Sequence, residues 1–456
     1  MRKGRPERIA HHFRKRLAED SQCGCWRCLT MLIEQVLELA LKRADGAQVT
    51  HYRTESTPVS FENDRLKTIK VSHTSGISLR VILNGREGTS NTNDLSDIEG
   101  LVDRAVETAR YGSPAHYTFP PHAEAQDVKL YDRNVSALTR EEMVQMGQQV
   151  LDAVKSYNPE LLVDVGVWKS ENELEFLNSA GARFTAQGTH FSISASVQRV
   201  REQDVMYVWY HRAWRAKTIE PQSIIDAVLA RLRLAERDAR IPSGYMPVLF
   251  TPNASYVLLT SLTMGVNGRN VLKGDSPLAG KLGQKLFDDA LSVTDNGLID
   301  YADGSSQYDG EGVPVRITPI VQNGVLTNFL YDLDTAGEAG TQTTGNGPGC
   351  RPHNTIVSTG DTPYEELIRS IDSGLLVDTV MGFGQSNIMQ GDFSVNVSLG
   401  YCIERGEVVG RVKNVMLTGN SYEALKEVEL SSEGEWVGGS VFAPYILVPS
   451  LSVTSK

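Results

Sequence analysis

Acidic residues and glycines gather in two short loops within residues 308–347. Asp309 and Glu311 alternate with glycines in the sequence DGEG. A pair of carboxylates is what acid–base hydrolysis of a glycoside needs. Two residues apart in a turn, however, carboxylates are more typical of side chains that accept backbone N–H bonds. Acid- and glycine-rich loops of this kind are not required by a packed core, so they are candidates for lining a site.

The second loop reads TGNG at Thr344–Gly347 and offers backbone donors for an anion or a peptide carboxylate. A simple connector loop explains the same four residues equally well. A further acid, Asp392, follows Gly391 at the start of the strand-rich C-terminal part. The candidates for a peptide groove or a subunit contact are Asp309, Glu311, Thr344, Gly345, Asn346, Gly347 and Asp392.

A β-hairpin is predicted between the two loops. The sequence indicates a strand over 313–322, a tight turn at Asn323–Gly324 and a return strand over 325–331, followed by a short helix. Asn-Gly between apolar runs favours a type I′ turn, because both central residues need φ > 0. The hairpin therefore positions both loops.

The nine histidines exclude some chemistry by their positions. None lies between His211 and His353, so the predicted helix at 253–264 carries no imidazole. A histidine-based zinc or general-base site within that segment is excluded. The sequence contains no G-x-S-x-G, phosphate-binding P-loop or H-E-x-x-H motif either.

The composition of the 456 residues indicates a cytosolic globular protein with two or three domains. A net charge of −11 argues against a broad nucleic-acid footprint, and no run approaches the ~20 apolar residues of a membrane span. Five cysteines are too few for a disulfide scaffold. We expect neither a nucleic-acid nor a membrane partner.

The first thirty residues differ from the rest. They are rich in Arg and Lys and lack the apolar segment of a secretory signal, so a loosely held tail, or a native start at Met31, is expected. A transit peptide is the weaker alternative. Cys23, Cys25 and Cys28 fit no standard zinc finger, so an incidental cluster is favoured over a metal site.

Hydrophobic periodicity predicts an α+β fold in two parts, with antiparallel or mixed sheets flanked by helices and a C-terminal half rich in strands. We expect a tail over 1–30, an N-terminal domain over 31–240 and a C-terminal domain over 241–456. The strands expected in the N-terminal domain are 47–53, 57–72, 77–83, 161–168, 173–177, 183–199 and 205–213.

Helices are expected over 31–44, from about 96, over 139–157, 221–240, 253–264 and 363–370. Ser96 with Glu99, and Thr139 with Glu142, have the spacing of capping boxes, and Asn253 is the expected cap of the 253–264 helix. The arginines of the 221–240 helix, Arg231 among them, suggest either a phosphate surface or, preferably, a solvated face.

Several short motifs occur along the chain: ARYGSP at 109–114, NSAG at 178–181, DGEG at 309–312, NGVL at 323–326, TGNG at 344–347, MGxG at 381–384, GDFS at 391–394 and LTGN at 417–420. Together they resemble the TldD/PmbA family, also known as TldD/TldE, peptidase U62 or modulator of DNA gyrase. They occur in family order between about Met31 and Val453. The resemblance implies a two-part α+β fold, a dimer, and cytosolic proteolysis of unfolded or peptide substrates.

The active TldD-type subunit of this family carries H-E-x-x-x-H on the helix that corresponds to 253–264, and a cysteine ligand near the C-terminus. Here the helix reads SYVLLTSLTMG and residues 434–453 contain no cysteine. The chain therefore resembles the PmbA/TldE branch, for which no catalytic residue and no metal ligand carries over. No cofactor is expected in this chain, and zinc is expected only in a TldD-like partner.

Three hypotheses follow. The first is a non-catalytic subunit that pairs with a TldD-like zinc protease and helps bind unfolded peptides for proteolysis or maturation. The second is a homodimeric peptide-binding or scaffold protein without protease activity. The third, held least strongly, is a hydrolase built on Asp309, Glu311 and Asp392.

Overall fold

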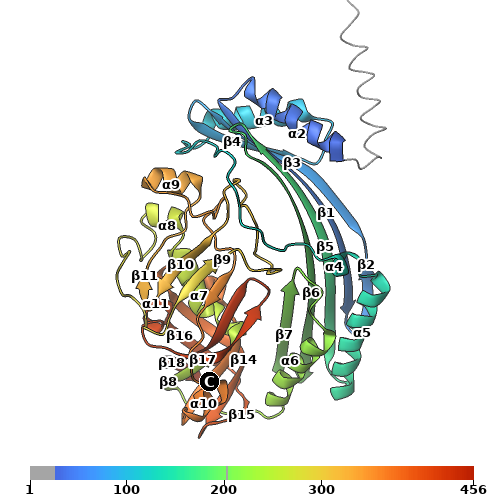
Figure 1. Cartoon of the computed structure of the whole chain (residues 1–456). Helices are drawn as coiled ribbons and strands as arrows, with labels where there is room; N and C mark the ends of the chain where they lie inside the picture. Colours follow the sequence, from blue (N-terminus) through green and yellow to red (C-terminus); the bar gives the residue numbers. More distant parts are fainter. Residues whose placement is uncertain (1–25, 202–203, 456) are drawn as a thin grey trace, which may run out of the picture. The chain divides into compact units, whose positions relative to one another are not determined.

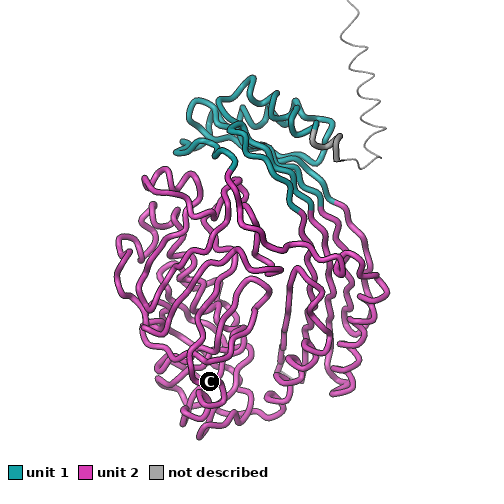
Figure 2. Tube along the Cα trace, viewed as in Figure 1, with its two compact units in different colours: residues 1–53, 74–122, 173–186 teal, residues 54–73, 123–172, 187–456 magenta. Residues whose placement is uncertain are grey.

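The computed structural model describes residues 26–201 and 204–455, with side chains from Met31 onward. The chain forms two compact units, each drawn from separate stretches of sequence (Figure 2). Unit 1 comprises residues up to Arg53, Thr74–His122 and Glu173–Ala186, and unit 2 comprises Thr54–His73, Ala123–Asn172 and the residues from Gln187 onward. Residues 1–25 of the predicted tail, and the side chains of Cys23, Cys25 and Cys28, lie outside the described residues, whereas 26–30 belong to helix α2 and extend it beyond the predicted start at Met31.

The elements are labelled in Figure 1. The α-helices are α2 (Trp26–Leu41), α3 (Ile98–Tyr111), α4 (Arg133–Ser136), α5 (Arg140–Tyr157), α6 (Pro221–Leu234), α7 (Tyr256–Gly265), α8 (Gly268–Leu272), α9 (Leu333–Ala339), α10 (Tyr364–Arg369) and α11 (Ser421–Ala424). Short 3₁₀ helices are η1 (Pro252–Ala254), η2 (Phe383–Gln385) and η3 (Ile388–Gln390).

Two sheets carry the strands. The first consists of β1 (Gly46–Glu62), β2 (Arg65–Ile69), β3 (Ser72–Leu83), β4 (Arg86–Thr92), β5 (Leu162–Asn178), β6 (Arg183–Arg201) and β7 (Asp204–Trp214). The second consists of β8 (Gly244–Phe250), β9 (Val293–Asn296), β10 (Ile317–Gln322), β11 (Val325–Leu326), β12 (Thr355–Val357), β13 (Ser373–Met381), β14 (Asp392–Glu404), β15 (Glu407–Arg411), β16 (Val415–Asn420), β17 (Glu429–Val437) and β18 (Val441–Ser455). The α+β class predicted from the sequence is confirmed.

In unit 1, helices α2 and α3 bury their apolar stripes against β1 and β3. The shared core includes Val36, Val49, Ile77 and Leu101, which are fully or almost fully buried. The predicted capping box at Ser96 and Glu99 is wrong. The adjacent Asp97 caps α3 instead, with its carboxylate accepting a hydrogen bond from Gly100 N at 3.0 Å.

The first sheet has longer strands than the sequence pattern predicts. The single strand expected over 57–72 is wrong, because the chain turns at Asn63 and Asp64, both with positive φ, between β1 and β2. Two of the expected strands, 161–168 and 173–177, are one continuous strand, β5. Strand β4 was not predicted, since its sequence REGTSNT is polar and carries no clear alternation.

In unit 2, helices α5 and α6 pack together beside β7. The predicted capping box at Thr139 and Glu142 is confirmed in both directions. Helix α6 ends at Leu234 rather than at Arg240. Arg231 is not part of a solvated face, because its guanidinium pairs with the buried Asp378 carboxylate at 2.9 Å and lies over the Tyr210 ring.

The second sheet contains a closed ring of strands. Its order runs β11-β10-β9-β12-β18-β16-β14-β13-β8, and β18 also pairs with β8, which closes the five strands from β18 to β8. Closure removes the free edges of these strands. The predicted turn at Asn323–Gly324 is confirmed, with φ of 46° and 76°. Strand β10 starts at Ile317 rather than at residue 313.

Helix α7 follows β8 and carries mostly apolar residues. Val257, Leu258 and Leu262 are completely buried in the core of the second sheet. Asn253 does not cap this helix as predicted. Instead, Thr251 caps the preceding η1 turn, and the Asn253 amide donates a hydrogen bond to the Asp378 carbonyl at 3.3 Å. Within the described residues, every helix is too short or too polar to cross a bilayer.

Candidate functional site

The Asp309 carboxylate is closed inside its own loops. It is 5% exposed, and it accepts hydrogen bonds from the backbone N–H groups of Glu311 and Val313, both at 2.9 Å, and of Gly347 at 2.8 Å. Burial raises the pKa of Asp309, and these three donors pull it in the opposite direction. A carboxylate held in this way joins the DGEG and TGNG loops.

Glu311 is buried as deeply, at 2% exposed. Its Oε2 accepts a hydrogen bond from Leu333 N at 2.8 Å, at the first turn of α9. The acid therefore supplies an acceptor to a helix N-terminus, where negative charge is favourable. Gly347 leaves room for it, because a Cβ at that position would collide with the Glu311 side chain.

Three of the four backbone donors of the TGNG loop, which one interpretation of its sequence offered to a ligand, are bonded within the protein. Thr344 N donates to the Tyr331 carbonyl, Gly345 N to Thr343 Oγ1, and Gly347 N to Asp309. These three donors are already used within the protein, so the connector interpretation holds for them.

A second buried acid, Asp295 of β9, extends the network. It is completely buried, and burial raises its pKa. One of its oxygens accepts a hydrogen bond from Asn346 Nδ2 at 2.6 Å, and the other accepts bonds from His353 N at 2.7 Å and Asn354 N at 3.1 Å. The network thus fixes the segment from Thr344 to Asn354.

Asp392 is not part of this network in the described residues. It is exposed at the start of β14 and accepts a hydrogen bond from Asn420 Nδ2 at 2.8 Å across the β14–β16 pair. The structure therefore brings Asp309 and Glu311 together with Gly347 and leaves Asp392 in another element.

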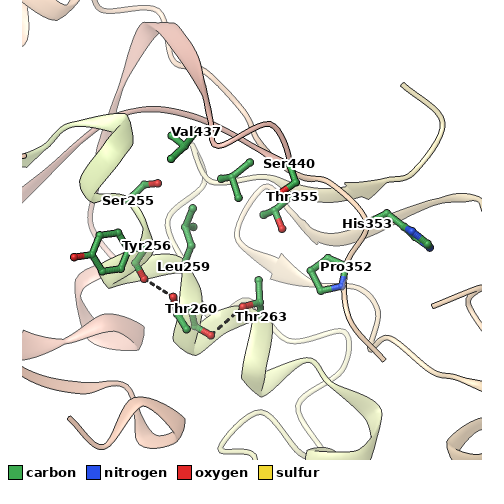
Figure 3. A pocket seen from close by; sticks show the side chains of 11 residues that line it. Ser255, Tyr256, Leu259, Thr260, Thr263, Pro352, His353, Thr355, Val437 and Ser440 are labelled. Atoms are coloured by element: carbon green, nitrogen blue, oxygen red, sulfur yellow. Dashed lines mark hydrogen bonds between the residues drawn. The ribbon is translucent and has the colours of Figure 1, made fainter. Parts of the chain in front are cut away.

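A cavity of about 240 Å³ opens beside the segment that the acids fix (Figure 3). Its walls come from three places in the sequence: one face of α7, the segment around His353, and the turn between β17 and β18. The lining residues are Ser255, Tyr256, Leu259, Thr260, Thr263, Pro352, His353, Thr355, Val437, Ser440 and Val441. None of the eleven is an acid, a lysine, an arginine or a cysteine.

The threonines of α7 turn their hydroxyl groups back onto the helix. Thr260 Oγ1 donates to the Tyr256 carbonyl at 2.6 Å and Thr263 Oγ1 to the Thr260 carbonyl at 3.0 Å, as Figure 3 shows. Tyr256 directs its own hydroxyl to the Val380 carbonyl at 3.2 Å, and burial raises its pKa. The donor hydrogens of this wall are thus committed to the protein's own carbonyls.

His353 lies at the edge of the cavity, with its ring pointing away from α7 (Figure 3). Its Nε2 is 2.8 Å from the Gly345 carbonyl, and a carbonyl oxygen only accepts, so Nε2 carries the hydrogen. No histidine lies between His211 and His353 in the sequence, and helix α7 has none of its own. The fold nevertheless brings His353 to the cavity beside α7.

Comparison with known proteins identifies this architecture. The model of the PmbA/TldA metallopeptidase C-terminal domain matches residues 243–455, which include every lining residue of the cavity, and the model of the PmbA/TldA metallopeptidase domain 1 matches residues 47–109. The chain belongs to the PmbA/TldD family.

Individual relatives agree with this assignment. The chain is 23% identical to the metalloprotease PmbA of Escherichia coli O157:H7 over 94% of its length and 97% of the relative's. It is 30% identical to a metalloprotease TldD homologue of Haemophilus influenzae over 42% of each chain. The crystal structure of TldE from Thermococcus kodakarensis shares the fold, with a TM-score of 0.84 and 21% identity over 93% of this chain and all of the other.

The cavity does not fit the zinc site of the TldD branch. Zinc in proteins is held by imidazole, thiolate and carboxylate groups, and a catalytic site usually supplies three of them. Helix α7 presents a phenol, an isobutyl group and two threonines whose hydroxyls are bonded to helix carbonyls. The one imidazole, His353, donates its Nε2 hydrogen to a carbonyl. No metal-dependent step can be derived from these residues.

Sequence reasoning did not identify the cavity: the 253–264 helix was noted only as the place where the TldD-type zinc motif is missing, and no residue that lines the cavity was among the candidates. A signal was nevertheless present in the spacing. Ser255, Tyr256, Leu259, Thr260 and Thr263 follow the i, i+1, i+4, i+5, i+8 pattern of a single helix face, and among the other residues of the helix only Ser261 bears a hydroxyl. A stripe of hydroxyl-bearing side chains on a mostly apolar helix indicates a face that lines a site.

Proposed function

We propose that this member of the PmbA/TldD family is a non-catalytic, peptide-binding subunit of the TldE type, which pairs with a TldD-like zinc protease. The observation that carries the proposal is the face that α7 turns to the cavity, where uncharged side chains stand in place of metal ligands. A cavity in a metallopeptidase domain whose lining lacks metal ligands is suited to holding substrate rather than cleaving it.

The comparisons support the two halves of the proposal differently. The family matches and the likeness to TldE support the fold and the branch, while the TldD homologue supports the existence of a related chain that could be the partner. The relatives named as metalloproteases set the opposite expectation, that this chain cleaves peptides by itself. The experiment must separate these two possibilities.

The proposal also includes the domain division and the compartment. The C-terminal family model, which begins at residue 243, supports a boundary close to residues 240 and 241. Five cysteines in 456 residues favour a reducing compartment, so we place the pair in the cytoplasm.

Metal analysis combined with a cleavage assay tests the proposal. The chain is purified alone and after co-expression with the TldD-like chain of the same source, and zinc per chain is measured by mass spectrometry. Cleavage of unfolded casein is followed in parallel. We expect less than 0.1 zinc per chain and no cleavage for this chain alone, with both zinc and cleavage appearing in the co-purified pair.

Stoichiometric zinc in the isolated chain, together with cleavage that the second chain does not change, would overturn the proposal. A chain that binds casein but never co-purifies with the TldD-like chain would instead favour the homodimeric scaffold. Casein cleavage by the isolated chain without zinc would favour the hydrolase built on Asp309, Glu311 and Asp392. Asp392→Ala would then test the exposed residue of these three.

A further inference from the structure

The lining of the α7 cavity is chemically apolar in spite of its threonines. A threonine whose hydroxyl hydrogen is bonded to its own helix has its methyl group left as the other surface of the side chain. Thr260 and Thr263 are in this state, and they stand beside Leu259 on the same helix face. On the opposite walls, Val437, Val441 and Pro352 add further apolar surface.

The absence of charge in this lining sets what the cavity can hold. A charged group that leaves water without a partner carries a large desolvation penalty. None of the eleven lining side chains carries a formal charge except His353 when it is protonated, and the His353 ring points away from α7 (Figure 3). An apolar guest, in contrast, gains by leaving water in proportion to the area that it buries.

The size of the cavity limits the guest further. About 240 Å³ is below the ~300 Å³ at which pockets for whole drug-sized ligands begin. It is enough for one large side chain, whereas a folded element or a run of several residues needs more room. The hydroxyl groups of Ser255, Thr355 and Ser440 lie in the same lining and can meet the polar backbone that carries this side chain.

We infer that the cavity is a subsite for a single uncharged, apolar side chain of the size of leucine, methionine or phenylalanine, carried by an extended peptide. The inference rests on the proposed function, because it takes the peptide as the ligand and adds which residue of that peptide is selected. The complementarity is one of charge and size: an uncharged lining of one-side-chain volume excludes Lys, Arg, Asp and Glu.

The test uses the full chain and a set of labelled, unstructured peptides. Each peptide has the same Gly/Ser-rich sequence with one central guest residue, which is Leu, Met, Phe, Ala, Asp or Lys. Binding is measured by fluorescence anisotropy. We expect Leu, Met and Phe peptides to bind about tenfold or more tightly than the Asp and Lys peptides, with Ala in between.

Two variants place a bulky ring in the cavity from different walls. Thr263→Phe fills it from α7, and Ser440→Phe fills it from the turn between β17 and β18. Each is expected to bring the Leu peptide down to the affinity of the Ala peptide. Thr108→Phe is the matched control, because Thr108 is an exposed helical threonine whose hydroxyl, like that of Thr263, is bonded to a carbonyl of its own helix, here that of Arg104.

The outcomes separate the inference from the proposed function. If all peptides bind with equal affinity and neither filling variant changes it, the subsite is wrong, while peptide binding stands. If no peptide binds at all, both the subsite and the peptide-binding function are wrong. Equal loss in Thr108→Phe would also count against the subsite. Circular dichroism and a denaturation midpoint check that each variant is folded. Because the two filling variants lie in separate elements, the test remains possible if one of them does not fold.

Discussion

The loops around Asp309 and the cavity beside α7 differ in the opposite way from what their sequences suggest. The loops look like a catalytic site but are closed, whereas the helix without candidate residues lines an open cavity. The loops carry the acids and glycines that usually mark a catalytic site, yet Asp309 is 5% exposed and its carboxylate accepts three backbone N–H groups of the protein. Helix α7 carries none of the candidate residues and lacks the zinc motif of the TldD branch, yet one of its faces lines the cavity. The type of a residue indicates which chemistry it could perform. Whether the residue is free to do so depends on whether its polar atoms already form hydrogen bonds within the protein.

The two regions are nevertheless connected. The segment from Thr344 to Asn354 is held at one end by Asp309, through Gly347, and at the other by Asp295, through His353 and Asn354. Pro352 and His353 of this segment then form one wall of the cavity. The acids thus act as positioning residues that fix one wall of the cavity, and under the proposed peptide binding the uncharged side chains of the lining would meet the guest.

Removing the Asp309 carboxylate should cause the largest loss of stability among the changes proposed for the two regions. Asp309→Ala leaves three buried N–H groups without their acceptor, and each such group costs about 1–3 kcal/mol, so we expect a loss of about 3 kcal/mol or more in the free energy of unfolding. Urea denaturation measures it. Asp289→Ala is the control, because the Asp289 side chain is 77% exposed and its removal should change stability by less than about 0.5 kcal/mol. Equal small losses in both would mean that the Asp309 network contributes little.

The second-largest loss of stability is expected from adding a methyl group at Gly347. Gly347→Ala pushes a Cβ into the Glu311 side chain, and overpacking of this kind typically costs about 1–3 kcal/mol. We expect a loss of about 2 kcal/mol by urea denaturation. Gly384→Ala serves as the control, because a Cβ there meets only open space. A Gly347→Ala variant as stable as wild type would show that the two loops are not packed as tightly as the buried acids indicate.

The pH dependence of stability separates two buried acids, Asp309 of the DGEG loop and Asp332, which caps helix α9. Burial raises the pKa of Asp309, so this group favours the folded state at acidic pH and that contribution is lost as the pH rises from the unfolded value, about 3.9, through the folded one. For Asp332, burial acts in the same direction, but hydrogen bonds from Thr335 and Gly349 and the nearby Arg269 hold the pKa below its usual range. Its stabilisation is present above about 3.9 and is lost as the pH falls through the folded value.

Urea denaturation between pH 3 and pH 7 measures both signs. The stability difference between wild type and Asp332→Asn should shrink toward low pH. Wild type should lose stability relative to Asp309→Asn as the pH rises from about 3.9. Slopes of the same sign for Asp309 and Asp332 would contradict the opposite environments that the structure assigns to them.

Local sequence rules predicted the features that short segments decide. The Asn323–Gly324 turn and the Thr139–Glu142 capping box depend on residues within four positions of each other, and both are confirmed. The rules failed where close competitors exist: Asp97 stands beside Ser96, and an aspartate caps a helix as well as a serine does.

Features that depend on distant residues were out of reach. Arg231 was expected to face solvent because its ion-pair partner, Asp378, lies 147 residues away in the sequence. The cavity was missed for the same reason, since its walls come from α7, from the segment around His353 and from the turn after Val437. The family motifs identified the fold, but they could not show that the acids of DGEG are buried.

The smallest effect is expected from removing the Thr260 hydroxyl, and it decides how the α7 wall recognises its guest. Valine has the shape of threonine, and the lost hydroxyl is bonded to the helix's own Tyr256 carbonyl, which keeps its other lone pair and its backbone partner. Thr260→Val should therefore change the free energy of unfolding by less than about 1 kcal/mol. Thr108→Val, with the same bond on an exposed face, should change it by a similar amount. The affinity of the Leu peptide should stay within threefold of wild type, because the methyl groups remain in the wall. A large loss of affinity in Thr260→Val alone would show that the hydroxyl itself binds the peptide. The α7 wall would then be a polar binding surface, which contradicts the apolar subsite.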